Sequence, residues 1–354
     1  MSDDRPGEPA DEGAGTPDES ADAPKPPLPR AAVGPSPVAQ VATAAVVVVV
    51  LVVLGVVFLV QGGGKKSALP EQDIDTVPTA PSSGFQPSRA DPLPPLPSIP
   101  ASLCPKAPLK KPLTVLTFNI HHGATKDEHL QLGRIGTEIK TWDPDIVLLQ
   151  EVDQGRSRTG GIQQAEALAK ATDLTWVYGG NQRSRGSGPI GNAILSRFPV
   201  VEWHNTLLPI ASGREQRGLL HAVINVDGTE ISAYATHFDH ASGVARLAQA
   251  RTTIKVLAAD PRPKILAGDL NTGPGGAPIR ALRSAGLGDA WAVGSGAGNT
   301  VPARNPRNRI DYVLHDGWFT PLQAVVLASG VSDHRAVWTR LEFRQELGCF
   351  KVGG

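Results

Sequence analysis

Residues 265–273 read I-L-A-G-D-L-N-T-G, a short apolar run that ends in two polar side chains. Pro263 and Gly268 bound the apolar part, which is the pattern of a short buried strand. Asp269 and Asn271 follow it, and residues two apart on an extended chain point to the same side. Such side chains at the carboxyl end of a buried strand are typical of an active site in α/β folds. The alternative is a turn in which both bond their own backbone.

Polar side chains also stand at the ends of four other predicted strands and directly before the last one. They are Asn119, Glu151, His237 and Asp311, followed by Asp333 and His334. Because functional side chains in layered α/β folds gather at strand ends, this recurrence favours a common site over an isolated turn.

The order of the predicted elements indicates the architecture. Two of the consecutive strand patterns are joined by Asp227-Gly228, which is a strong hairpin signal. Apolar residues at roughly helical spacing predict a helix over Glu128–Trp142, and a second helix is expected over about Val244–Ala259. Hairpin strands with helices before and after them predict an α/β fold of two face-to-face sheets with the helices outside.

The residue types at the strand ends restrict the chemistry. They are carboxylates, amides and imidazoles, and neither Cys104 nor Cys349 lies among them, which excludes a zinc–thiolate site. Oxygen ligands with few nitrogens favour Mg²⁺ or Mn²⁺, and Mg²⁺ is typically held by one or two carboxylates and a substrate phosphate. A histidine paired with a carboxylate can orient or deprotonate water. The set therefore predicts metal-assisted phosphoester hydrolysis.

Seven short blocks, in order, resemble the endonuclease/exonuclease/phosphatase superfamily. This superfamily groups pancreatic-type deoxyribonucleases, abasic-site endonucleases, neutral sphingomyelinases and inositol polyphosphate phosphatases. The blocks are T-F-N-I (117–120), L-L-Q-E-V-D (148–153), G-N-A-I-L-S-R-F-P (191–199), A-T-H (235–237), A-G-D-L-N (267–271), R-I-D-Y-V (309–313) and S-D-H-R-A-V (332–337). The resemblance covers about residues 113–343. It implies a four-layer α/β sandwich with two mostly antiparallel sheets between helices.

Transferred residue by residue, the resemblance implies a metal site and a paired histidine. Glu151 would be the main metal ligand, with Asn119 and Asp333 beside it. Asp311 would pair with His334, which fixes the tautomer of the ring and raises its basicity.

The resemblance also implies roles around the reacting phosphate. Asp269 and Asn271 would position the attacking water and the phosphorane oxygens, and His237 would contact the phosphate or protonate the leaving oxygen. The choice of general base between Asp269 and His334 stays open. Asn192 would support the site through hydrogen bonds, and the pair His121-His122 is expected to line the pocket.

Arginines concentrate on three loops before site strands. Arg185, Arg217 and Arg309 are the candidates for phosphate contact, with dispersed solvated charge as the alternative. From Cys104 onward the chain has 28 Lys and Arg residues against 22 Asp and Glu residues, which suits an anionic substrate. We expect a nuclease acting on DNA. The alternatives are a phosphodiesterase acting on phospholipid or sphingomyelin, and an inactive binding module.

The N-terminal third predicts a membrane anchor. Residues 1–37 form an acidic tail without aromatic residues, which predicts disorder. Residues 38–61 contain twenty uncharged residues from Val41 to Val60, long enough to cross a bilayer as one helix. A Pro-rich linker over residues 62–112 would precede the catalytic domain at 113–346, and residues 347–354 would form a short tail.

The orientation of this span rests on weak signals. Lys25 and Arg30 precede it and Lys65 and Lys66 follow it, so the count of flanking positive charges is tied. Cys104 and Cys349 bracket the folded region, and a disulfide between them would place the domain in an oxidising compartment. Two unrelated thiols are the alternative. We therefore expect a single-pass protein of the cell membrane with its catalytic domain outside the cytoplasm, and infer no protein partner.

Overall fold

The computed structural model describes residues 109, 111–183 and 187–344. The predicted acidic tail, the predicted span, both cysteines, the C-terminal tail and nearly all of the predicted linker lie outside these residues. Within the described ranges, no helix combines the length and the apolar character that crossing a bilayer requires.

The first of two β-sheets has six strands in the order β11-β12-β1-β2-β4-β3. β1 and β2 run parallel, and the other neighbours run antiparallel. The strands are β1 (Leu113–Asn119), β2 (Ile146–Asp153), β3 (Thr175–Arg183), β4 (Pro189–Ser196), β11 (Phe319–Leu327) and β12 (Ala336–Phe343).

The second sheet also has six strands, in the order β5-β6-β7-β8-β10-β9. Here β7 and β8 are the parallel pair. The strands are β5 (Val200–Leu207), β6 (Gly218–Val226), β7 (Thr229–His237), β8 (Lys264–Asp269), β9 (Gly288–Asp289) and β10 (Asp311–His315). Each sheet therefore contains one parallel pair among antiparallel neighbours.

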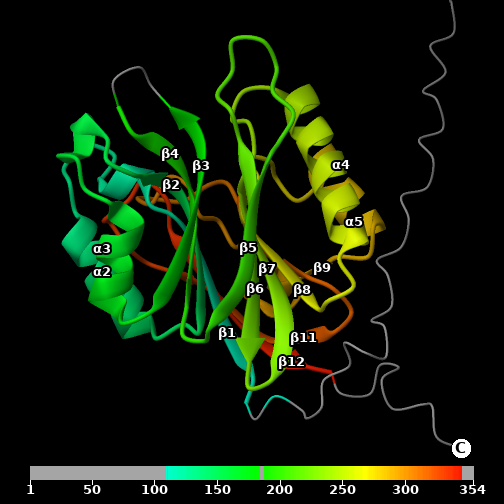
Figure 1. Cartoon of the computed structure of the whole chain (residues 1–354). Coiled ribbons are helices and arrows are strands. Elements are labelled where there is room, and N and C mark those ends of the chain that lie inside the picture. The colour runs from blue at the N-terminus through cyan, green and yellow to red at the C-terminus, as the bar shows by residue number, and fades with distance from the viewer. Residues whose placement is uncertain (1–108, 110, 184–186, 345–354) are drawn as a thin grey trace, which may run out of the picture. The chain divides into compact units, whose positions relative to one another are not determined.

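The two sheets lie face to face, and helices cover their outer faces (Figure 1). The helices and short turns are α2 (Leu132–Trp142), α3 (Gln164–Thr172), α4 (Gly243–Ala259), α5 (Ala277–Ser284), η2 (His121–Gly123), η3 (Ser157–Thr159) and η4 (Ala290–Val293). Side chains of α2 and α3 pack on the first sheet, and those of α4 and α5 pack on the second. A third cluster fills the space between the sheets. The expectation of an α/β sandwich of two sheets between helices is confirmed.

Local sequence explains why these helices cover the sheets. Ile135 and Ile139 lie four apart on α2, so both face the sheet, and both are fully buried. Ser242 caps α4 by accepting a hydrogen bond from the backbone N–H of Ala245 at 3.2 Å. These contacts fix the outer layers and leave the strand ends free for polar side chains.

The helix predicted over Glu128–Trp142 begins later, at Leu132. Glu128 has a left-handed backbone (φ 61°), and an isolated β-bridge pairs Ala124 with Leu130. The prediction was wrong for residues 128–131 because a loop closed by this bridge replaces the first turn. The apolar spacing did not reveal the loop, since Leu130 fits the helical pattern although it is exposed.

Candidate active site

Strand register in the second sheet places three predicted site residues side by side. Asp269, the last residue of β8, is paired with His237 on β7 and with Asp311 on β10. All three side chains are buried. The antiparallel direction of β10 matters here, because it brings the first residue of β10 to the carboxyl end of β8.

His334 joins this row from the loop before β12. Its Nδ1 lies 2.9 Å from Oδ2 of Asp311, and its Nε2 lies 3.7 Å from Oδ2 of Asp269. The Ser332 hydroxyl accepts a hydrogen bond from the backbone N–H of His334 and fixes the loop. The structure thus brings together the Asp311–His334 pair that the sequence motifs implied.

Burial and neighbouring charges perturb this group strongly. Burial raises the pKa of Asp269, and the nearby Asp311 carboxylate raises it further. Burial alone would lower the pKa of His334, but the hydrogen-bonded Asp311 carboxylate, together with the charges of Asp269 and Asp333, outweighs it and raises this pKa to about 10. The arrangement therefore favours an imidazolium at His334 near neutral pH.

His237 lies among donors. Nη1 of Arg217 is 2.9 Å from His237 Nδ1, and a guanidinium can only donate. Nδ1 therefore accepts, and in the neutral ring the proton lies on Nε2, which is 3.4 Å from the acceptor Oδ2 of Asp269. The amide nitrogen of Asn271, beside the same ring, donates to the backbone oxygen of Phe238 at 3.0 Å. Burial first, and the charge of Arg217 second, keep the pKa of His237 well below its usual value. The ring is neutral and oriented.

Asn119 links the two sheets at the site. Its amide nitrogen donates to Oε1 of Glu151 at 3.0 Å and to Oδ2 of Asp269 at 3.2 Å, so carboxylates from both sheets meet on one amide. Glu151 adopts a left-handed backbone (φ 56°) where the register of β2 shifts between Leu149 and Val152. Such a bulge redirects a side chain. Glu151 is the one residue of β2 that is only half-buried.

The collected side chains line one open cavity of about 440 Å³. Of the residues expected at the site, it is lined by Glu151, Arg217, His237, Asp269, Asn271, Asp333 and His334, and also by His121. The structure thus joins residues that are up to about two hundred positions apart in the sequence into one polar surface.

The remaining predicted residues lie elsewhere. Arg309 is buried and pairs with Asp289, and its guanidinium lies 4.6 Å from the ring centre of Tyr312. It is not among the residues that line the cavity, so the structure does not bring Arg309 together with the other predicted site residues. Arg185 lies outside the described residues. Asn192 is buried on β4 and donates to the carbonyl oxygens of Gly218 and Ala235. These two hydrogen bonds tie the two sheets together behind the site.

Sequence reasoning missed several cavity residues. Arg156 and Arg158 reach the cavity from the turn that follows β2. Arg158 makes two hydrogen bonds to Asp153, at 2.7 and 2.8 Å, which raise its pKa and keep the guanidinium charged. The segment Q-G-R-S-R directly after the L-L-Q-E-V-D block was the available signal. His240, Gln182 and Glu215 also line the cavity, but none of them lies within one of the seven blocks.

The donor set fits a hard divalent cation. Glu151 and Asp333 offer carboxylate oxygens at the cavity wall, and the Asn119 amide lies against Glu151. Asp269, Asp311 and His334 form a further group whose ligand atoms lie within 4.8 Å of one another. Oδ1 of Asp311 is buried and has no partner among the described residues. An uncompensated carboxylate oxygen beside other carboxylates is the environment that a bound cation neutralises.

Sequence comparison identifies the class of protein. The family model of the Endonuclease/Exonuclease/phosphatase family matches residues 116–334, and the chain belongs to this family. The uncharacterized protein YbhP of Escherichia coli (strain K12) is 30% identical over 213 residues, which cover 56% of this chain and 83% of YbhP.

Solved structures with the same fold agree with this assignment. An endonuclease/exonuclease/phosphatase from Beutenbergia cavernae has a TM-score of 0.53 at 25% identity and covers 66% of this chain and 72% of its own. The mannosyl-6-phosphatase Bt3783 of Bacteroides thetaiotaomicron has a TM-score of 0.56 at 20% identity, and the match covers 65% of this chain and 100% of Bt3783. The catalytic domain of human Nocturnin has a TM-score of 0.54 at 20% identity, and the match covers 67% of this chain and 97% of that domain. The last two show the fold alone.

Proposed function

We propose that this protein is a divalent-metal-dependent phosphodiesterase. The observation that carries the proposal is the Asn119 amide, which joins Glu151 of the first sheet to Asp269 of the second within 3.2 Å. An arrangement that concentrates buried carboxylates costs stability unless a cation neutralises them. Family membership supports phosphoester hydrolysis as the reaction.

Glu151, Asn119 and Asp333 would hold Mg²⁺, or Mn²⁺ in its place, which supplies positive charge to the phosphoryl oxygens. Asp269 would orient the attacking water and take its proton, because its Oδ2 is central to the surrounding polar groups. His334, kept protonated by Asp311, would donate to a phosphoryl oxygen as negative charge develops there. His237 and Asn271 would bind the remaining oxygens and the leaving group.

The preferred substrate in this proposal is DNA. Arg156, Arg158 and Arg217 lie around the cavity and can contact successive phosphates of a polyanion. The excess of basic residues from Cys104 onward supports the same choice. Purified protein should therefore cut plasmid DNA with Mg²⁺ and stop when EDTA is added.

A phospholipid head group is the second candidate. Trp203 and Leu207 on β5, Ile210 just after this strand and Val244 at the start of α4 each expose at least half of their surface. Exposed apolar side chains of this kind suit contact with a lipid surface. Sphingomyelin vesicles tested beside plasmid DNA separate the two candidates, and turnover of vesicles alone would replace the nuclease proposal.

We further propose that residues 38–61 anchor the protein in the cell membrane with the catalytic domain outside the cytoplasm. The uncharged stretch from Val41 to Val60 supports the anchor. Protease added to intact cells should remove the catalytic domain. Protection of the domain until the cells are lysed would reverse the orientation.

Replacing the main metal ligand tests the site. Glu151→Ala should lower turnover by about a thousandfold or more, because metal ions contribute several kcal/mol to the transition state. Glu166→Ala, a replacement of a carboxylate in α3, is the control and should keep full activity. Comparable turnover by E151A and wild type would remove Glu151 from the site.

A further inference from the structure

A second cluster of metal-binding side chains lies beside the catalytic cavity. The η2 turn after β1 carries His121 and His122, and the following loop returns Glu128 to them. Nε2 of His122 is 2.8 Å from Oε2 of Glu128, and Nε2 of His121 is 3.7 Å from Oε1 of the same carboxylate. The potential ligand atoms all lie within 4.8 Å of one another.

The partner of His121 fixes where its lone pair points. Its Nδ1 lies 3.2 Å from the backbone oxygen of Thr125, which can only accept a hydrogen bond. In the neutral ring the proton is therefore on Nδ1, and Nε2 presents a lone pair to the Glu128 carboxylate. Two acceptors that face each other repel unless a cation lies between them. A ring N–H bonded to a backbone carbonyl is also the usual support of a metal-binding histidine.

His122 can offer its Nε2 without losing another hydrogen bond. The residue is only 4% exposed, and its Nδ1 has no partner among the described residues. Because Nδ1 of His122 makes no hydrogen bond within these residues, no contact at this atom favours one tautomer over the other. The ring proton can move from Nε2 to Nδ1, and Nε2 then binds a metal in place of its contact with Glu128.

The backbone holds these residues in an uncommon conformation. His121, His122 and Glu128 all have left-handed φ angles, of 45°, 44° and 61°. For residues other than glycine this conformation is unfavourable. Surrounding contacts maintain it: Oδ1 of Asn119 accepts the His121 N–H, and the Gln164 amide donates to the His122 carbonyl at 2.7 Å. The two histidines are thus positioned before any ligand binds.

We propose that His121, His122 and Glu128 bind a first-row transition-metal dication, with Zn²⁺ as the best match, at the wall of the catalytic cavity. Two imidazoles and one carboxylate are a known zinc ligand set that leaves a position for water or substrate. Imidazole ligands select against Mg²⁺, so this site differs in chemistry from the oxygen-rich one. His121 also lines the cavity, so the ion would add positive charge to its wall.

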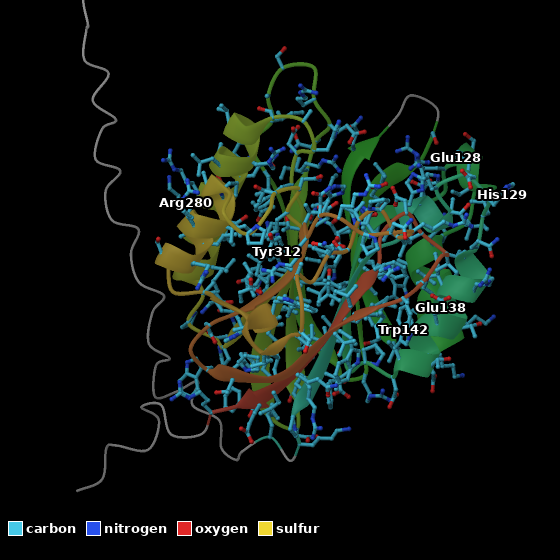
Figure 2. The ribbon with its side chains drawn as sticks, turned by 180° about the vertical axis from the view of Figure 1, so that it is seen from behind. Glu128, His129, Glu138, Trp142, Arg280 and Tyr312 are labelled. Atoms are coloured by element: carbon cyan, nitrogen blue, oxygen red, sulfur yellow. The ribbon has the colours of Figure 1, made fainter. Side chains whose placement is uncertain are left out.

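Exposure supplies the route for the metal. Figure 2 shows Glu128 and its neighbour His129 at the surface on the side of α2, whereas Arg280 lies on the opposite side. The Glu128 side chain is 67% exposed, so an ion can reach the cluster without passing through the catalytic cavity. The two sites can therefore be loaded and tested separately.

Cobalt absorption tests the proposal directly. Purified full-length protein is stripped with a chelator, saturated with Mg²⁺ and titrated with Co²⁺, whose visible bands report nitrogen ligation. Wild type should bind one equivalent at this site, and Zn²⁺ should displace it. Glu128→Gln and His121→Gln should each weaken binding by at least about tenfold, the loss seen when even a residue supporting a metal ligand is removed.

Matched replacements in the same loop serve as controls. Asp127→Asn and His129→Gln change an exposed carboxylate and an exposed imidazole next to the cluster, and both should bind Co²⁺ like wild type. Glu151→Ala should also retain the bands, because it alters the other site. Wild-type affinity in both E128Q and H121Q, or bands lost only in E151A, would overturn the proposal.

Discussion

Asp311 illustrates how one residue acts through its neighbours. Its Oδ2 lies 2.9 Å from Nδ1 of His334, and its charge raises the pKa values of both His334 and Asp269. Both effects follow from burial, because a charge in a medium of low polarity acts strongly on nearby groups. The residue thus controls the protonation of two groups assigned to the reaction.

Asp311→Asn should separate this charge from the shape of the side chain. The pKa of His334 should fall from about 10 toward its usual 6.5, because the strongest of the opposing charges is removed and only those of Asp269 and Asp333 remain against burial. Turnover should fall by about 10- to 100-fold. NMR titration of the His334 ring in protein stripped of metal measures the change in pKa, and steady-state kinetics measures the change in turnover.

Asp227→Asn is the matched control for this variant. Asp227 lies in the β6–β7 turn with φ 51°, a conformation that asparagine also adopts readily. A His334 pKa that stays near 10 in D311N would show that another group protonates the ring.

At the scale of elements, the pairing of β7 with β8 places His237 beside Asp269. Gly268 makes this pairing possible. Its φ is 150°, and a Cβ there would lie 1.9 Å from the backbone oxygen of Thr236 on the adjacent strand. A backbone atom within a sheet cannot move away as a side chain can. The glycine in the A-G-D-L-N block is therefore required by the close approach of two strands.

Gly268→Ala should destabilise the domain by ~3 kcal/mol, a large effect for one methyl group, because the β7–β8 ladder must distort. Gly273→Ala has open space around the added Cβ and should change stability by less than about 0.5 kcal/mol. Denaturant unfolding of both variants measures the difference. Equal stability of the two would contradict the close approach.

At the scale of the whole molecule, stability depends on pH because buried histidines have pKa values that are shifted in opposite directions. Burial lowers the pKa of His221 and His315 from the usual 6.5, so both are neutral in the fold. The unfolded chain binds protons at these sites first, so their contribution is present above 6.5 and is lost as the pH falls. His334 acts in the opposite direction, and its contribution is lost as the pH rises toward about 10.

The melting temperature of protein stripped of metal should therefore fall on both sides of neutral pH. His315→Gln should reduce the drop between pH 7 and pH 5 by about 2–4 °C, which corresponds to ~1 kcal/mol in a domain of this size. Glutamine can still donate to the Asp316 carbonyl that Nδ1 of His315 contacts. An unchanged drop in this variant would exclude His315 as a source of the pH dependence.

The sequence alone determined the main elements and most of the site. Buried strands such as Ile265–Ala267 are continuous apolar runs, and Asp227-Gly228 marks a hairpin, because local chemistry sets both signals. Asp269 and Glu151 could be chosen because each lies just beyond the end of such a run, separated from it by one residue. These features depend on neighbours in the chain, so the residues themselves reveal them.

Tertiary structure decided the features that depend on distant partners. Arg309 and Arg217 have the same local character, yet Asp289 holds the first in the fold while the second lies in the cavity beside His237. The loop that turns Glu128 toward His122 replaced a helical turn for the same reason. Charge and hydrogen-bond partners from other strands and loops determine where such side chains point, and the order of residues does not encode those partners locally.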